Sequence, residues 1–139
     1  MPPAVLGGFL VVHGLITTMI GVGAVANPNS PAMTLPSWFS WWPGPFGRSW
    51  LVDALDLGTG ASVLGGLVWL AAGVTLVAAG LGWLGVPGLR DLWQPLAFVG
   101  AAVGLVALAL YFHPFYLVAV VIDVAVVVLL WGRLTTATS

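Results

Sequence analysis

The chain of 139 residues is 60% hydrophobic and only 5% charged, with three basic residues, four acidic residues and no cysteine. Soluble domains carry about 25% charged residues, so this composition excludes a water-soluble globule and a disordered segment. Three basic residues are too few to neutralise a phosphate backbone, which excludes a nucleic-acid partner. The absence of cysteine excludes disulfides and thiolate chemistry. The sequence therefore indicates an all-α protein whose solvent is the lipid bilayer.

Four apolar segments are long enough to cross a hydrocarbon core, which needs about 20 helical residues. Helices are expected because backbone polar groups in lipid must be satisfied within the segment. We predict one integral membrane domain over 1–139, an antiparallel bundle with spans at 4–26, 60–84, 92–111 and 115–132. Ala24-Val25-Ala26 resembles a signal-peptide cleavage site. No Lys or Arg precedes the first apolar run, however, so we expect that run to remain as a span.

The connection over 27–49, which follows the first span, is much longer than the connections that follow the second and third spans. It holds five prolines, which exclude a continuous helix, and five aromatic residues, of the kind that prefer the headgroup region. We expect an interfacial loop that lies on the bilayer. Alternating spans then place aromatic residues in two belts. One belt holds Trp83, Trp93 and Trp131, and the other holds Trp38, Trp41, Trp42, Trp50, Tyr111 and Tyr116.

The few charged residues predict an orientation. Arg90 and Arg133 share a face with the amino terminus, whereas Arg48 lies on the opposite face. The positive-inside rule then places both termini in the cytoplasm, with the chain in the cell membrane.

Glycine spacing predicts how the helices pack. Glycines recur every seven residues on the first two spans, and the third span adds a GxxxG pair. Small residues at a regular interval let helix backbones approach closely in lipid. Either these glycines pack the spans of one chain, with Gly100 and Gly104 also able to join two chains, or glycine is merely abundant. The glycines concerned are Gly7, Gly14, Gly21, Gly66, Gly73, Gly80, Gly100 and Gly104.

Asp123 lies in the middle of the fourth span, where a carboxylate must face the bundle interior. At 1.5 Å per residue, His13 and Thr75 lie at about the same depth, roughly 14–15 Å from one face. Thr17 lies one turn from His13. We predict a polar layer of these four residues. Either a His–Asp hydrogen bond fixes the helix register, or the pair holds a ligand or transfers a proton. We expect no metal site, and the sequence assigns no cofactor.

A second cluster is predicted at the opposite face, from Arg48, Asp53, Asp56 and His113. The spacing of Asp53 and Asp56 places both carboxylates on one face of a helix. Either they begin a solvated helix, where acidic groups suit the positive end of the dipole, or they form a headgroup or cation site beneath the Trp-rich loop.

The chain resembles the DoxX-like small four-helix membrane proteins of bacteria. The resemblance rests on Val12-His13-Gly14, the glycine-rich second span, Trp93-Gln94-Pro95-Leu96 and Ile122-Asp123. It implies a four-helix membrane bundle, and we carry no catalytic residue across.

No nucleophile motif, phosphate loop or zinc helix is present. We therefore expect a non-catalytic membrane protein, either an accessory subunit of a larger membrane complex or a binder of a lipid-like small molecule. The alternative is a membrane enzyme or proton-coupled carrier that uses His13 and Asp123. Oligomerisation with further copies of the chain stays open.

Overall fold

The computed structural model describes residues 3–31, 37–39, 41 and 47–136. Within these ranges the chain forms helices and turns and no strand. The α-helices are α1 (Pro3–Ala26), α2 (Trp50–Ala54), α3 (Gly58–Trp83), α4 (Trp93–Leu110) and α5 (Leu117–Thr136). Short 3₁₀ helices cover Ser37–Phe39, Arg90–Leu92 and Pro114–Tyr116.

Four helical segments in the described part of the chain are long and apolar enough to cross a membrane. They are Ala4–Ala26, Gly58–Trp83, Arg90–Leu110 and Pro114–Gly132. The prediction of an all-helical chain with four such segments is therefore confirmed.

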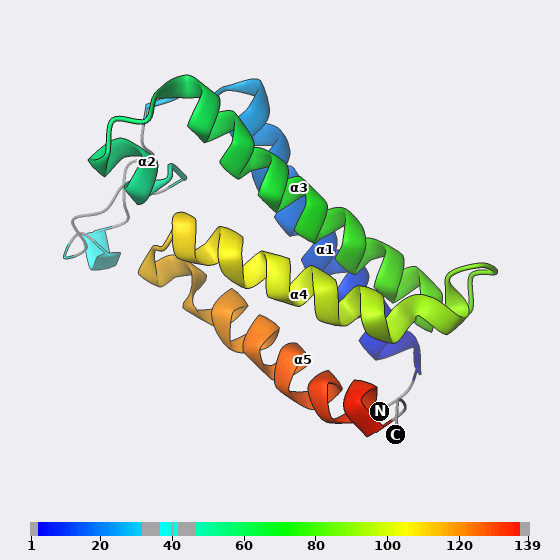
Figure 1. Cartoon of the computed structure of the whole chain (residues 1–139). Helices are drawn as coiled ribbons and strands as arrows, with labels where there is room; N and C mark the ends of the chain where they lie inside the picture. The colour runs from blue at the N-terminus through cyan, green and yellow to red at the C-terminus, as the bar shows by residue number, and fades with distance from the viewer. Residues whose placement is uncertain (1–2, 32–36, 40, 42–46, 137–139) are drawn as a thin grey trace.

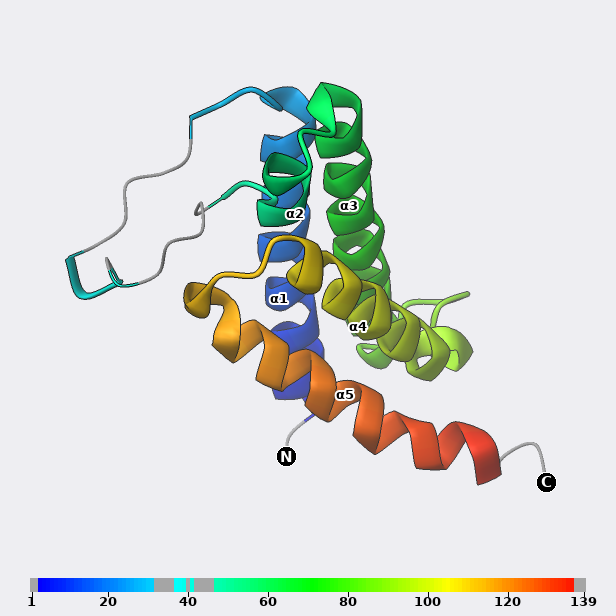
Figure 2. The same ribbon diagram turned by 60° about the vertical axis from the view of Figure 1, so that its left-hand side comes forward.

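The helices pack in the order α1, α3, α4, α5, each against the next (Figure 1). The start of α1 and the end of α5 lie at one end of the bundle, as both ribbon views show (Figures 1 and 2). The helix α2 and the turn between α4 and α5 lie at the other end, which we call the α2 end. In Figure 2, α5 crosses in front of α1.

The glycines of α1 and α3 meet along one seam. A Cβ on Gly14 would lie 2.7 Å from the carbonyl oxygen of Gly73, and one on Gly21 would lie 2.9 Å from that of Gly66. At the other end of the seam, a Cβ on Gly80 would lie 2.8 Å from the carbonyl oxygen of Gly7. From one facing pair of glycines to the next, the residue number rises by seven on α1 and falls by seven on α3. The two helices therefore run in opposite directions, with their backbones in close approach.

The two glycines of the GxxxG pair on α4 lie inside the chain. A Cβ on Gly100 would meet the side chain of Leu76 on α3, at 2.9 Å, and one on Gly104 would meet Asp123 on α5, at 2.5 Å. Both glycines are buried. This pair therefore packs α4 against α3 and α5 within the chain, and a contact between two chains through it stays a prediction.

The segment before α3 is not one helix. The short helix α2 ends at Ala54, and the chain turns through Asp56 (φ 48°) and Gly58 (φ 75°) before α3 begins. Asp53 lies in α2 and Asp56 lies in the turn, so the prediction that both share one helix face is wrong. The hydroxyl of Ser49 caps α2 by accepting a hydrogen bond from the Val52 amide.

Four of the tryptophans expected in belts, namely Trp38, Trp41, Trp50 and Trp131, are exposed, but the tyrosines are buried. Trp38 and Trp41 are each 66% exposed, whereas Tyr111 is 3% and Tyr116 8% exposed. The tyrosines pack with Trp69 in the core at the α2 end. Their place in a belt is therefore a wrong prediction, because ring packing and one hydrogen bond, from the Tyr111 hydroxyl to the Ser62 carbonyl, hold them inside. Trp42 lies outside the described residues.

Candidate functional site

His13 of α1 and Asp123 of α5 form the central polar contact of the bundle. The Nε2 atom of His13 lies 3.0 Å from Oδ1 of Asp123, and the two side chains are 12% and 3% exposed. The ring of Phe9, one turn earlier on α1, lies parallel to the imidazole with its centroid 6.0 Å away. The contact links the first helix of the bundle directly to the last.

The carboxylate of Asp123 has room inside the bundle because α4 has no side chain at the facing position. Gly104 lies under Oδ2 of Asp123, the oxygen that does not face His13. The missing side chain thus lets a polar group be buried between α4 and α1 without displacing either helix.

The two threonines of the predicted layer hydrogen-bond to their own helices. The Thr17 hydroxyl, which is buried, donates to the carbonyl oxygen of His13 at 2.8 Å. The Thr75 hydroxyl donates to the carbonyl oxygen of Ala71 at 2.6 Å. A hydroxyl has one proton to donate, so neither threonine donates to the His13–Asp123 pair. Of the four predicted residues, the structure thus joins His13 and Asp123 through their side chains. Thr17 contacts only the backbone carbonyl of His13 by hydrogen bonding.

His113 does not join the predicted cluster at the surface. It is fully buried, and its Nδ1 accepts a hydrogen bond of 3.0 Å from the amide of Phe115. The imidazole therefore caps the turn that leads into α5, and Pro114 follows at the first position, where no amide hydrogen is needed. Burial lowers the pKa of His113, because removal from water disfavours the charged form. This histidine is a structural cap, which the charge pattern of the sequence could not indicate.

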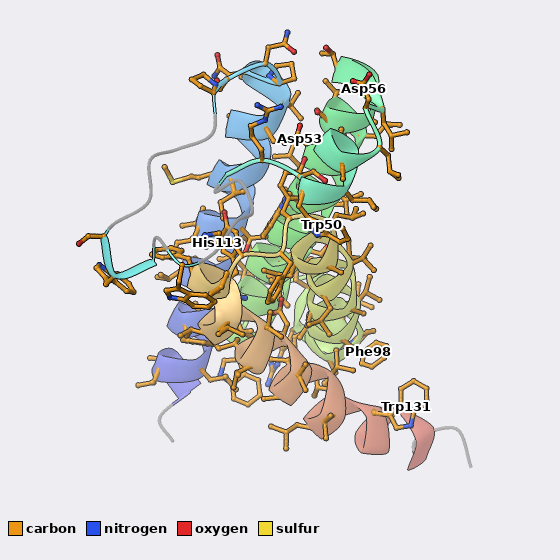
Figure 3. All side chains as sticks on the ribbon, turned by 90° about the vertical axis from the view of Figure 1, so that its left-hand side faces the viewer. Trp50, Asp53, Asp56, Phe98, His113 and Trp131 are labelled. Atoms are coloured by element: carbon orange, nitrogen blue, oxygen red, sulfur yellow. The ribbon has the colours of Figure 1, made fainter. Side chains whose placement is uncertain are left out.

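Arg48 and Asp53 form an ion pair at the α2 end. The Nη2 atom of Arg48 donates to Oδ1 of Asp53, and the two side chains are 40% and 30% exposed. Asp56 is exposed in the turn that follows. Figure 3 shows Asp53 and Asp56 at the top of the molecule, with His113 lower and beside the start of α5. Of the predicted cluster, the structure thus brings Arg48 and Asp53 into contact and buries His113 elsewhere.

A cavity of about 510 Å³ opens at the α2 end. Its walls come from the second half of α1, the described residues within 27–31 and 47–49, and the turn between α4 and α5. Most of the wall is apolar, including Ile16, Met19, Ile20 and Phe115, and Arg48 and Ser49 line one side. Met19 and Phe115 are 73% and 51% exposed, so the cavity opens toward the outside of the bundle. The sequence reasoning missed it, because no motif marks a space between helices.

The described residues hold no group of three or more His, Asp or Glu side chains placed to bind a metal ion. No model of a known protein family matches the chain, and no curated protein or solved structure is significantly similar to it. The resemblance to DoxX-like proteins stays a prediction.

Proposed function

We propose that this chain is a multi-pass protein of the cell membrane that binds one lipid-like molecule in the cavity at the α2 end. In this proposal the four apolar helices cross the bilayer as an antiparallel bundle with both termini in the cytoplasm. The α2 end then lies at the outer leaflet, where the Trp-rich connection meets the headgroups.

The cavity is the observation that carries this proposal. Its volume of about 510 Å³ falls within the range of roughly 300–1,000 Å³ that is typical of sites for small ligands. Such sites combine apolar walls with a few polar groups that fix the orientation of the ligand. Here Ile16 and Ile20 suit an apolar chain, and Arg48 and Ser49 supply polar contacts on one side. An opening between exposed apolar side chains suits a ligand that enters from the bilayer.

Filling the cavity tests the proposal. A Cβ on Gly23, which lines the cavity, would have no atom within 4 Å, so Gly23→Leu adds a side chain without a clash at its base. Gly8→Leu is the matched control, because Gly8 also has open space on α1 but does not line the cavity. We expect lipid retained by the purified protein, measured by native mass spectrometry, to fall for Gly23→Leu and to persist for Gly8→Leu. Equal retention in both variants would show that the cavity is not the site.

A second candidate function, proton-coupled transport or catalysis, is favoured by the His13–Asp123 pair. Buried ionisable groups in a membrane are typical of proton pathways, and this pair has its atoms within hydrogen-bonding distance. The test is proton flux into liposomes that contain the full chain and a pH-sensitive dye, under an imposed potential. A transport role predicts flux that Asp123→Asn abolishes, because an amide cannot take up the proton. A register role predicts no flux and a stably folded Asp123→Asn variant.

A further inference from the structure

A second cavity, of about 420 Å³, adjoins the first at the α2 end. Its walls are polar where those of the first are apolar, since they include Asn29, Asp53, Asp56 and Thr59. The two cavities share Pro28, Arg48 and Ser62 as lining residues, so they meet along one wall. Together they form an apolar chamber and a polar chamber side by side.

The charged side chains of the two chambers have a definite order. The acidic residues Asp53 and Asp56 line the polar chamber and not the apolar one, whereas Arg48 lines both. From the apolar chamber outward, the order is therefore apolar wall, then guanidinium, then carboxylates. A phospholipid with an amino headgroup has the complementary order, namely acyl chain, then phosphate, then ammonium.

We propose that the paired chambers bind a phospholipid whose headgroup ends in a primary ammonium, of the phosphoethanolamine type. An acyl chain lies in the apolar chamber, the phosphate lies against Arg48, and the ammonium lies between Asp53 and Asp56. This inference rests on the proposed function, since it names the chemical class of the lipid-like ligand.

Arg48 can bind the phosphate of the ligand while it keeps its ion pair with Asp53. A guanidinium has five N–H donors, and the contact with Asp53 is made from Nη2. With its side chain 40% exposed, Arg48 has further donors that can reach a ligand. Paired N–H donors of arginine match two oxygens of a phosphate group. The ion pair therefore positions the guanidinium at the junction of the chambers.

The polar chamber discriminates among headgroups by charge and by hydrogen bonding. Arg48, Asp53 and Asp56 together give it a net negative charge, which disfavours an anionic lipid such as a phosphatidylglycerol. A primary ammonium donates three hydrogen bonds, for which carboxylates are strong acceptors. A choline headgroup donates none and is bound instead by aromatic rings, and the described residues that line the polar chamber include no aromatic side chain. These contacts favour ethanolamine over both alternatives.

The test is native mass spectrometry of the full chain in detergent with phosphatidylethanolamine, phosphatidylcholine and phosphatidylglycerol of identical acyl chains. The variants are Asp56→Asn, which alters an exposed carboxylate, and Arg48→Gln, with circular dichroism as a check on folding. Asp91→Asn and Arg90→Gln are the matched controls, because both residues are exposed and lie at the opposite end of the bundle. Soluble phosphoethanolamine serves as a competitor that has the headgroup without the chain.

We expect the unaltered chain to bind phosphatidylethanolamine about tenfold more tightly than the other two lipids, since a hydrogen bond to a charged group contributes roughly that much. Asp56→Asn should reduce this preference and improve phosphatidylglycerol binding. Arg48→Gln should weaken all three lipids, and the control variants should match the unaltered chain.

Three results would overturn the inference, and they separate it from the proposed function. Equal binding of the three lipids, or an unchanged preference in Asp56→Asn, refutes the headgroup assignment but leaves lipid binding in place. Competition by soluble phosphoethanolamine at the affinity of the lipid refutes the role of the apolar chamber. Failure of every lipid to bind refutes the inference and the proposed function together.

Discussion

The carboxylate of Asp123 occupies the space that a side chain on Gly104 would need. A Cβ at position 104 would lie 2.5 Å from Oδ2 of Asp123, while Oδ1 of the same group contacts His13. One absent side chain on α4 thus permits a polar contact between α5 and α1. The structural consequence is that α1, α4 and α5 are coupled at a single depth of the bundle.

Gly104→Ala should therefore destabilise the bundle. The added methyl group must displace the Asp123 carboxylate, and overpacking of this kind costs about 1–3 kcal/mol. That cost exceeds the gain of up to about 1 kcal/mol that alanine brings to a helix. We expect the free energy of unfolding in detergent to fall. The matched control is Gly8→Ala, where a Cβ meets nothing within 4 Å. A Gly104→Ala variant as stable as Gly8→Ala would contradict the packing described above.

The strength of the His13–Asp123 contact can be measured by a double-mutant cycle. Polar contacts between helices in a membrane contribute about 0.6 kcal/mol on average and at most about 1.7 kcal/mol. We expect His13→Ala and Asp123→Ala to show a coupling energy in that range, since the carboxylate is 3% exposed and within 3.0 Å of the imidazole. The measurement is unfolding in detergent of the two single variants and the double variant.

The control cycle pairs Thr75→Ala with Asp123→Ala. Because the Thr75 hydroxyl donates to Ala71 of its own helix, these two substitutions should be additive. Coupling between Thr75 and Asp123 as large as that between His13 and Asp123 would argue for the wider polar layer instead.

His113 predicts a loss of stability on acidification. An exposed histidine has a pKa near 6.5, and burial lowers the pKa of His113 in the folded chain. The unfolded chain therefore takes up this proton first, so stability falls as the pH drops below about 6.5 toward the lower folded pKa. Protonation also removes the Nδ1 acceptor that caps the Phe115 amide.

The variant His113→Asn tests this prediction, because asparagine caps a helix well and does not titrate. We expect the decrease in the free energy of unfolding between pH 7.5 and pH 5.5 to be smaller in His113→Asn than in the unaltered chain. The control His13→Asn removes the other histidine. In that variant, the part of the decrease in the free energy of unfolding that is due to His113 should remain. Identical pH dependence in His113→Asn and the unaltered chain would show that His113 is not the titrating group.

Some features of this fold follow directly from the sequence, and others depend on packing that no local pattern encodes. The four helices were predictable because their apolar runs exceed the length that a bilayer requires. The seam of α1 and α3 follows from the repeat of seven, since glycines at that interval lie along one stripe of each helix and these are the ones that meet. The burial of Tyr111 was not predictable, because tyrosine suits a headgroup region equally well. Whether it turns inward depends on Trp69, which lies 5.8 Å away between ring centroids and on another helix.

In the candidate sites, too, some features follow from the sequence and others depend on how the helices pack. That His13 and Asp123 lie at one depth follows from counting residues, but their hydrogen bond also depends on Gly104, which the sequence alone assigns to no particular partner. The two chambers depend on where residues far apart in the chain come together, such as Ile20, Arg48 and Phe115. A cavity is a property of the assembled helices, so hydropathy and spacing contain no signal for it.

The attachment of α2 to the end of α4 supports both chambers and can be tested by substitution. The Ser49 hydroxyl donates to the carbonyl oxygen of Leu110 at 2.7 Å, and Nε1 of Trp50 donates to that of Ala109 at 2.8 Å. These are carbonyl groups that the end of a helix leaves without a helical donor.

Trp50→Phe keeps the ring packing but removes one hydrogen bond, which is worth about 1 kcal/mol. We expect amide hydrogen exchange over 47–57 to accelerate about fivefold. Trp131→Phe, on an exposed residue at the opposite end of the bundle, is the control and should leave that segment unchanged. Unchanged exchange in Trp50→Phe would show that the hydrogen bond of Trp50 does not hold α2 in place.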